Sequence, residues 1–312
     1  MESYAQTASV GFVDSTDIKE DSEALKRRAE EEGYLYFRHL LPEDALRKLR
    51  LQILSICQLY GWIADNTDLL AGIGNQENIR QLHDREEVKR GVGISLAAYA
   101  DVQRLELFHA LPHHPNLMSI YRRLLGEEAL PHPRNIARVM LPDPRLAPTP
   151  PHQDFIHIQG TTRAWTCWFP LGDCPRSLGG LAILRGSHKD GLLPVKEAEG
   201  AGGLESWLCK NEHEWLEHDY EIGDIVTFSS HTVHKALPNT VGNLIRLSCD
   251  YRYQNAKEEI EKKSLDPHYQ VTTWEDIYEN WQSGAFKFYW RKKSFSFSEW
   301  DESIRWQKQD IC

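Results

Sequence analysis

The spacing of apolar residues changes along the chain, from a helical period to short strand-like runs. Before residue 130, apolar positions such as Leu46, Leu49 and Ile53 recur at steps of three and four, which gives a helix one buried face. From Asn135 onward, short apolar runs are separated by glycine, proline and asparagine. We therefore predict a helical first part and a strand-rich second part.

In the first part, helices are predicted where strong helix formers lie next to residues that start or stop a helix. These helices are residues 22–32 with Gly33 as the stop, one that opens at Pro42, about 97–110, and 115–125, with a short aromatic strand at 34–40. Residues 63–96 have weaker periodicity and are predicted as loop with a short polar helix around 76–89. This region could form a lid over the site or an ordinary surface loop, and the sequence favours neither.

Six runs of the second part are predicted as strands, namely 136–141, 152–159, 162–171, 180–186, 224–230 and 244–253. Because helices do not alternate with most of them, a sandwich or barrel is favoured. A helix is expected within the insertion at 203–217. The tail from Ala256 predicts a helix near 273–282 and then an aromatic run. This tail is interpreted as a wrap on the domain or on a partner subunit, or as a cap over the mouth of the site.

Composition narrows the class of protein. The chain has 312 residues, 41% of them hydrophobic and 26% charged, as in a globular protein. The net charge of -10 argues against nucleic-acid or anionic-membrane binding. No signal peptide is seen at the start, and no apolar run reaches the roughly 18 residues of a membrane span. The six cysteines form no CxxC pair, so we expect reduced thiols and a cytoplasmic location.

A candidate metal site lies in the segment Thr149-Pro-Pro-His-Gln-Asp-Phe. On extended backbone, His152 and Asp154 point to the same side and can face one metal ion. A third ligand is expected after the apolar run 224–228, where His231 and His234 are both candidates. Three residues apart on a strand, they face opposite ways, so only one should reach the metal.

Two histidines and one carboxylate leave open positions on a metal, an arrangement typical of non-haem Fe(II) oxygenases. Zinc is the alternative, usually to generate a hydroxide nucleophile. Arg246 lies 12 residues beyond His234, and Ser248 follows on the same strand face. An inward arginine in an apolar barrel needs a carboxylate partner, and a dicarboxylate such as 2-oxoglutarate would fit. A zinc hydrolase would have no such requirement.

The order of the segments PPHQDF, AWTCWFPLGD, GGLAILRGSHK, GDIVTFSSHTVHKALPN and RLS resembles the phytanoyl-CoA dioxygenase family of Fe(II)/2-oxoglutarate oxygenases, over roughly residues 33–253. The resemblance implies a mainly β fold, a double-stranded β-helix (jelly-roll, cupin-like) with flanking helices. It implies iron binding by the HxD pair and a distal histidine, and favours His234 over His231. It also puts the cosubstrate arginine at Arg246 and places Trp165 against 2-oxoglutarate.

Some neighbouring residues have open roles. Gln159 and His157 are candidates for contact with cosubstrate or substrate, the alternative being hydrogen bonding within a loop. Trp168 is offset by three from Trp165 and is expected to face the other way. The turn that carries Arg185, Ser187 and His188 is expected to be structural. In related halogenases a glycine or alanine replaces the carboxylate ligand, so Asp154 disfavours halogenation.

The sequence thus predicts one oxygenase domain over 1–312, with a helical part at about 17–130, a jelly-roll core at about 135–253 and an extension at about 256–312. Fe(II), 2-oxoglutarate and O₂ would serve to oxidise an unactivated C–H bond of a small molecule, with succinate and CO₂ released. Hydroxylation is the default outcome, and desaturation, ring formation and ring expansion are also open. A natural-product intermediate is favoured because the chain ends in Asp-Ile-Cys, which is no peroxisomal signal. The alternatives are a metal-dependent hydrolase and a non-catalytic jelly-roll binding protein, and a monomer and a homodimer are both open.

Overall fold

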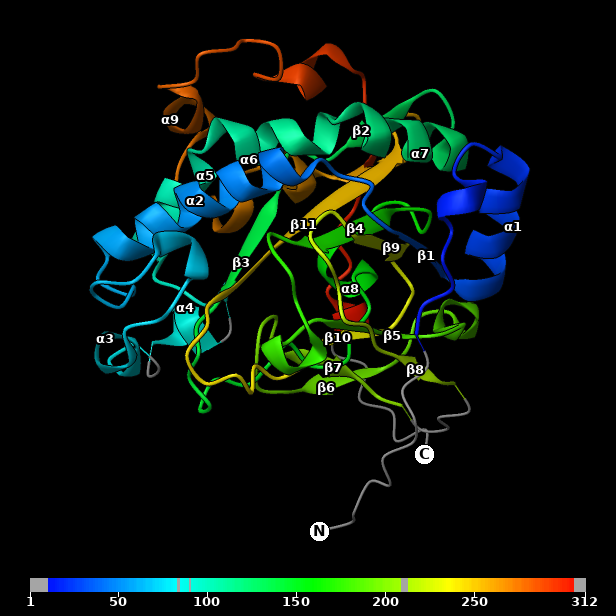
Figure 1. The fold of residues 1–312 in the computed structure, drawn as a ribbon. Coiled ribbons are helices and arrows are strands. Elements are labelled where there is room, and N and C mark those ends of the chain that lie inside the picture. Colours follow the sequence, from blue (N-terminus) through cyan, green and yellow to red (C-terminus); the bar gives the residue numbers. More distant parts are fainter. Residues whose placement is uncertain (1–10, 83–84, 90, 209–212, 306–312) are drawn as a thin grey trace.

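The computed structural model describes residues 11–82, 85–89, 91–208 and 213–305. A layer of helices covers one face of a six-stranded sheet, and a three-stranded sheet lies on the other side of that sheet (Figure 1). Two facing sheets with helices on one side are the predicted jelly roll, and this prediction is confirmed. None of the described helices is both long enough and apolar enough to cross a membrane.

The helices lie mostly in the first part of the chain. They are α1 (Ser22–Glu32), α2 (Glu43–Leu59), α3 (Gln76–Arg80), α4 (Glu86–Lys89), α5 (Leu96–Gln103), α6 (Glu106–Ala110), α7 (Pro115–Leu125), α8 (Phe155–Ile158) and α9 (Trp274–Tyr278). The ends of α1 follow from local chemistry. The Asp21 carboxylate accepts the N–H groups of Glu23 and Ala24, and Gly33 closes the helix in the left-handed region at φ 79°.

The larger sheet has the order β1-β9-β4-β11-β2, and β3 pairs with β11 beside β2. Its strands are β1 (Tyr34–Phe37), β2 (Ala129–Pro131), β3 (Ile136–Met140), β4 (Trp165–Pro170), β9 (Ile225–Ser229) and β11 (Arg246–Asn255). The smaller sheet has the order β10-β5-β8, from β5 (Leu181–Leu184), β8 (Trp215–Leu216) and β10 (His234–Ala236). Two further pairs are β6 (Val195–Glu197) with β7 (Leu204–Ser206), and β12 (Ile260–Glu261) with β13 (Phe297–Ser298).

Strand alternation divides the side chains of β4 and β11 between two environments. On β11, Leu247, Cys249 and Tyr251 pack in the core between the sheet and the helices. The intervening residues of β11 point between the two sheets, and they are polar: Arg246, Ser248, Asp250, Arg252 and Gln254. The inner face of β11 is therefore a polar strip beside a cluster of buried aromatic and aliphatic side chains.

The turn after β5 fastens the smaller sheet to α1. Arg185 forms an ion pair with the buried carboxylate of Glu32, and the ring of His188 lies against Gly33. A Cβ at Gly33 would come within 2.2 Å of that ring, so this position needs glycine for space as well as for its positive φ. The hydroxyl of Ser187 accepts the N–H of Val233 at 2.8 Å, which fixes the residue before His234. The turn is structural, as predicted.

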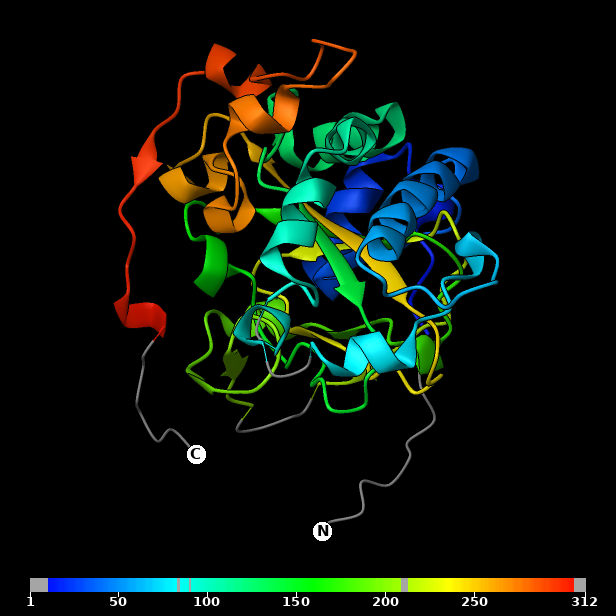
Figure 2. The ribbon, with the colours of Figure 1, turned by 90° about the vertical axis from the view of Figure 1, so that its left-hand side faces the viewer.

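The C-terminal extension forms its own aromatic cluster and then runs along the outside of the barrel (Figure 2). Trp274, Tyr278, Trp281 and Trp290 make this cluster, and the Thr273–Asp276 capping box starts α9. Further on, β13 pairs with β12 in parallel. The extension therefore packs on the outside of the domain and reaches the end of α8.

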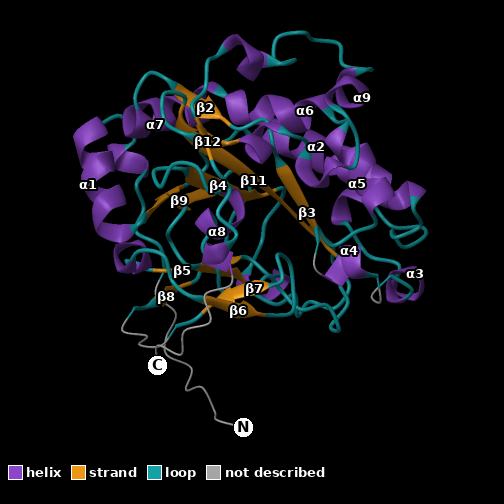
Figure 3. Cartoon of the chain, turned by 180° about the vertical axis from the view of Figure 1, so that it is seen from behind, coloured by secondary structure: helices purple, strands orange, loops and turns teal. Residues whose placement is uncertain are grey.

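The structure corrects several predicted elements. Only His152 of the segment 152–159 makes a β-bridge, and the chain then turns into α8, which lies between the larger sheet and β5–β7 (Figure 3). The insertion 203–217 holds strands β7 and β8 and no helix in its described residues, and 209–212 lie outside them. The predicted helices at 76–89 and 97–110 are each split in two, and Pro42 precedes α2 as its N-cap.

Candidate metal centre

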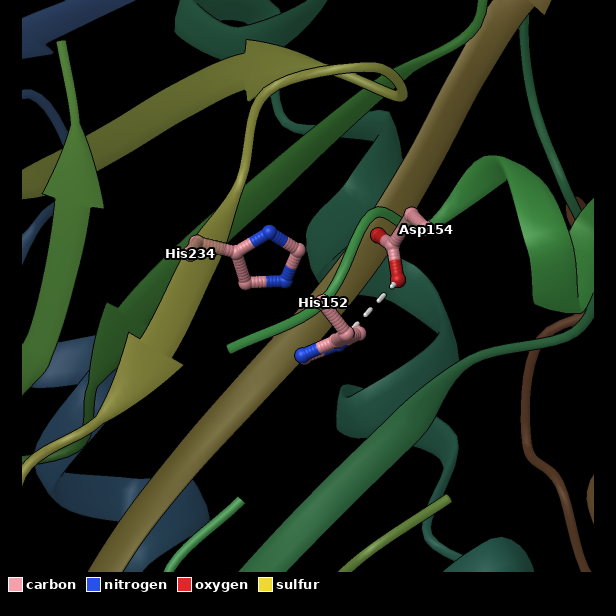
Figure 4. Close-up of side chains that lie close together, drawn as sticks. All are labelled: His152, Asp154 and His234. Atoms are coloured by element: carbon pink, nitrogen blue, oxygen red, sulfur yellow. Dashed lines mark ion pairs between the residues drawn. The ribbon is translucent and has the colours of Figure 1, made fainter. Parts of the chain in front are cut away.

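His152, Asp154 and His234 meet between the two sheets (Figure 4). Their potential ligand atoms all lie within 4.8 Å of one another, and all three side chains are buried. The backbones of His152 and His234 exchange two hydrogen bonds of 2.9 and 3.0 Å, which hold the HxD segment against β10. His152 and His234, 82 positions apart in the chain, are thus fixed at one place.

Each histidine is oriented by a backbone carbonyl. Nδ1 of His152 lies 2.8 Å from the carbonyl oxygen of Pro150, and Nδ1 of His234 lies 3.0 Å from that of Thr232. A carbonyl only accepts hydrogen bonds, so Nδ1 carries the proton and the lone pair of Nε2 is left for a metal. Burial, and then the neighbouring His234, lowers the pKa of His152 to about 3, so both rings are neutral near pH 7.

Asp154 is held as an anion. Its Oδ2 accepts the hydroxyl of Thr166, and its Oδ1 accepts Nη2 of Arg252 at 3.1 Å. Burial is the largest single influence on its pKa and acts upward. Arg252, His234 and His152 together outweigh burial and hold the pKa of Asp154 well below its usual range. Two neutral imidazoles and a carboxylate are the ligand set of a divalent metal with open coordination positions.

Gln153, between the two ligand residues, anchors the segment. Its amide nitrogen donates to the carbonyl oxygens of Gly191 and His231, each at 2.7 Å, and its amide oxygen accepts the N–H of Leu193 at 2.8 Å. The side chain is fully buried. Gln153, Thr166 and Arg252 were not singled out from the sequence. For Arg252, the available signal was its position on the same strand face as Arg246 and Ser248.

Arg246 lies beside the triad and makes no ion pair with a carboxylate of the described residues. Its Nη1 donates to the hydroxyl of Ser248 at 2.6 Å, and its Nη2 contacts the Met140 sulfur at 3.6 Å. Its Nε is buried and has no hydrogen-bond partner. One small cavity is lined by Arg246, the three triad residues and the apolar side chains of Trp168, Leu181 and Phe228.

An unpaired guanidinium in such a cavity fits an anionic ligand that also reaches the metal. A buried cation without a counter-charge is costly, and a carboxylate could accept two of its N–H donors at once. The donor set and the orphaned Nε therefore both suit a dicarboxylate such as 2-oxoglutarate bound between the metal and Arg246.

His231 does not join the triad. Its ring packs against Phe155, with ring centres 4.7 Å apart, and its Nδ1 lies 3.3 Å from the Ser230 hydroxyl. The metal-ligand geometry of the described residues selects His234.

The two other residues predicted to contact the cosubstrate do not line the cavity beside Arg246. Trp165 packs with the core on the helix side, whereas Trp168 lines the cavity, its ring centre 6.0 Å from the guanidinium carbon of Arg246. Gln159 lies away from Arg246. Its amide donates to the carbonyl of Asp301 and accepts the N–H of Asp301, both at 2.7 Å.

A jelly roll that encloses two histidines, an aspartate and a buried unpaired arginine defines the class of iron oxygenases that use 2-oxoglutarate. The model of the phytanoyl-CoA dioxygenase (PhyH) family matches residues 29–246, and the chain belongs to this family. The protein is an Fe(II)- and 2-oxoglutarate-dependent oxygenase, as predicted.

Two relatives of this chain are named as hydroxylases. The 1-deoxypentalenic acid 11-beta-hydroxylases of Streptomyces arenae and Streptomyces exfoliatus are each 27% identical, over 82% of this chain and 89% of each relative. Among solved structures, the alpha-ketoglutarate-dependent carbocyclase SnoK from nogalamycin biosynthesis has a TM-score of 0.52 at 21% identity, over 80% of this chain and 89% of that chain. The epimerase SnoN, solved with Fe³⁺, alpha-ketoglutarate and nogalamycin RO, has a TM-score of 0.51 at 21% identity, over 77% and 85%. At these identities the two structures support the fold.

Proposed function

We propose that His152, Asp154 and His234 hold Fe(II), and that Arg246 with Ser248 binds the distal carboxylate of 2-oxoglutarate. The reaction is hydroxylation of an unactivated C–H bond of a small molecule. The observation that carries this assignment is the buried, unpaired guanidinium of Arg246 in the same cavity as the triad.

The chain prepares the site in three ways. The carbonyls of Pro150 and Thr232 keep both imidazoles in the tautomer that binds a metal. Arg252 and Thr166 keep Asp154 ionised and fix its direction. The apolar walls formed by Trp168, Leu181 and Phe228 exclude water. When bound, iron with 2-oxoglutarate and O₂ supplies an oxidant able to take hydrogen from an unactivated C–H bond, with succinate and CO₂ as coproducts.

The substrate is proposed to be a natural-product intermediate. The relatives named for hydroxylation of 1-deoxypentalenic acid support this class, since they align with 82% of the chain. The presence of Asp154 supports hydroxylation over halogenation, because a halide would need the position that the carboxylate takes. Arg246 argues against the two alternatives, a metal-dependent hydrolase and a non-catalytic binding protein, because neither needs a second carboxylate-binding group beside the metal.

Anaerobic reconstitution tests the assignment. Purified protein is loaded with Fe(II), titrated with 2-oxoglutarate, and exposed to O₂ while succinate is measured. One equivalent of iron, saturable 2-oxoglutarate binding and O₂-dependent succinate are expected. A hydrolase would act without 2-oxoglutarate, and a binding protein would take up no iron, so either result would overturn the proposal.

We also propose that the three regions work as one oxygenase domain in the cytoplasm, as a monomer or homodimer. The helix-side core joins residues of α1, α2 and α7 to β4 and β11, which supports a single folding unit. Cys57, Cys167, Cys174 and Cys249 are buried and free, which supports a reducing location. Light scattering would distinguish the two oligomeric states.

A further inference from the structure

A second cavity adjoins the triad at the other end of β11. It has a volume of about 440 Å³ and shares His152 and Asp154 with the small cavity beside Arg246. Arg252 lines this second cavity, and Arg246 lines the first. Six residues of strand separate these two arginines by about 20 Å. The metal triad therefore has a cationic cavity on each side.

Four arginines line the second cavity, and two of them have structural partners. Arg138 donates to the carboxylate of Asp250 at 2.8 Å, and Arg252 donates to Asp154 at 3.1 Å. Only two carboxylates line the same cavity: Asp154, and Glu197, which is exposed. The lining thus carries an excess of positive charge, supplied by Arg134 and Arg305.

Arg134 makes no hydrogen bond to a carboxylate. Its Nε donates to the backbone carbonyl of Asp266 at 3.3 Å. The nearby carboxylates are engaged elsewhere: that of Glu261 accepts the N–H of Lys263 at 2.8 Å, and that of Asp266 accepts the amide of Gln270 at 3.1 Å. Within the described chain, the guanidinium of Arg134 therefore makes no ion pair, although Asp266 and Glu261 lie near enough to interact with its charge.

Arg305 is similarly short of partners. Among the described residues, its one ion pair is long, 3.8 Å from Nη1 to the carboxylate of Glu302, which is itself 55% exposed, and its guanidinium carbon lies 5.8 Å from the ring centre of Trp300. Its Nε is buried without a hydrogen-bond partner. Arg134 and Arg305 come from segments 171 residues apart, and both line one cavity beside the metal triad.

The C-terminal extension carries Arg305 to this position. The paired hydrogen bonds of Gln159 and Asp301 tie the extension to the end of α8. The ammonium of Lys263 lies 4.5 Å from the ring centre of Trp300, and β13 is paired with β12 just before it. These contacts hold the last described stretch along the side of the barrel (Figure 2).

The remaining walls are largely apolar or aromatic. Ile136, Leu204 and Tyr269 line the cavity, and Gly202 lies so close to His157 that an added Cβ would be 3.2 Å from its ring. Such a space suits an apolar body that carries one anionic group.

We propose that this cavity binds the substrate and that Arg134 and Arg305 together bind a carboxylate of that substrate. The inference rests on the proposed function and names the substrate class: a compact, largely apolar molecule with a free carboxylate. Two guanidinium groups offer planar pairs of donors that match a carboxylate. The carboxylate fixes the substrate at one end, so that a C–H bond of the apolar body faces the triad.

Calorimetry with three probes tests the proposal: 1-adamantanecarboxylate, its primary amide and its coenzyme A thioester. The protein is loaded anaerobically with Fe(II) and saturated with 2-oxoglutarate, which occupies the Arg246 side. The acid is expected to bind at least about tenfold more tightly than the amide, the factor expected of a charge-assisted hydrogen bond. Arg134→Gln and Arg305→Gln should each remove most of this preference, and Arg305→Lys should restore part of it.

Arg291→Gln is the matched control, since Arg291 belongs to the same extension, is exposed and does not line the cavity. It should keep the full preference for the acid. Equal affinity for acid and amide, tighter binding of the thioester, no binding of any probe, or an unchanged preference in both arginine variants would each overturn the proposal. Melting temperatures of the variants exclude unfolding as the cause of a lost preference.

The test separates this proposal from the proposed function. Iron uptake and 2-oxoglutarate binding are measured on the same samples before the probes are added. If both are normal and the acid preference is absent, only the carboxylate site is wrong. If iron or 2-oxoglutarate fails to bind, the assignment of the metal centre is wrong. The affinities for the acid and the amide are then compared on the metal-free protein.

Discussion

The two arginines of the inner face of β11 differ in what surrounds them. Arg246 and Arg252 are both buried, and in both the Nε has no partner. Arg252, however, donates to the carboxylate of Asp154, whereas the side-chain partners of Arg246 are the neutral Ser248 and Met140. Arg252 is thus paired with a carboxylate, whereas Arg246 makes no ion pair with any carboxylate of the described residues.

This difference teaches that burial and residue type alone do not assign a role. A buried arginine that already has a carboxylate orients a metal ligand and keeps it ionised. A buried arginine without a carboxylate marks the place of an anionic ligand. The following predictions test this division of roles along β11, beginning with the ligands that lie between its two ends.

Removal of a triad histidine should abolish both iron binding and turnover of 2-oxoglutarate. His152→Ala is expected to abolish iron binding and to reduce succinate formation to background, because two ligands remain where three are needed. Metal analysis after anaerobic loading measures this. His231→Ala is the control and should keep its iron, since that ring packs against Phe155. Loss of iron in both variants would contradict the assignment of His234 as the distal ligand.

Arg246→Met should mainly affect 2-oxoglutarate. The concentration that gives half-maximal succinate formation is expected to rise on the order of 100-fold, because loss of one partner of a buried charge pair costs about 2–5 kcal/mol. Iron affinity should change little. A 2-oxoglutarate titration of the iron-loaded variant measures the effect.

Arg252→Met should show the opposite pattern. Iron affinity is expected to fall about 10- to 100-fold, as for other groups that orient a metal ligand. The requirement for 2-oxoglutarate at saturating iron should change much less. Parallel iron and 2-oxoglutarate titrations of the two variants are the measurement. If both variants lost iron affinity equally, the two arginines would have the same role.

Acid should destabilise the Arg252 end of the strand. His132 is buried, and its Nε2 lies 2.9 Å from the amide oxygen of Gln254. Burial, and then Arg252, lowers its pKa from 6.5 to about 3. Because the folded state keeps this ring neutral, its contribution to stability is present above pH 6.5. The contribution is lost as the pH falls toward 3, by about 1.4 kcal/mol per pH unit for one proton.

His132→Gln tests this slope. Denaturant unfolding between pH 6 and pH 4 should show a shallower pH dependence than the parent protein, by the contribution of one group. His109 and His113, whose pKa values burial lowers to about 4, remain as the background in both proteins. An unchanged slope would mean that His132 is charged in the folded state.

The polar end of β11 at Arg246 could be predicted from sequence because its parts are compact motifs. Arg246 and Ser248 are two residues apart on β11, so strand alternation puts both on one face, and His152 and Asp154 are recognisable as an HxD pair although Asp154 already has helical backbone. The other end could not be predicted in this way. His157 was a candidate because it follows the HxD pair, but Arg134 and Arg305 belong to separate segments, and only the path of the C-terminal extension brings them to one cavity.

Two local errors have different causes. The apolar-rich run from Phe155 to Ile158 suits a strand or a helix, and the hydrogen bond from the Phe155 N–H to the Ser230 carbonyl marks where the chain leaves the sheet. In β4, aromatic residues lie on both faces of the strand, so the aromatic pattern does not show which tryptophan points inward. The contact of Thr166 with Asp154 sets the inward phase, and that contact is not visible in the sequence.

The smallest expected effect on the 2-oxoglutarate requirement comes from the tryptophan of β4 that faces inward. Trp168 shares the inward face with Thr166, and its ring lies at the limit of cation–π contact with Arg246. Trp168→Phe should raise the 2-oxoglutarate requirement two- to fivefold, since an interaction of about 0.5–1 kcal/mol is weakened. Trp165→Phe, on the helix side, should leave the requirement unchanged. Both variants shorten a partly or fully buried ring, so general destabilisation would affect the two alike and appear in kcat as well. A rise in the Michaelis constant for 2-oxoglutarate with Trp165→Phe alone would place Trp165 beside the cosubstrate and reverse the assigned phase of β4.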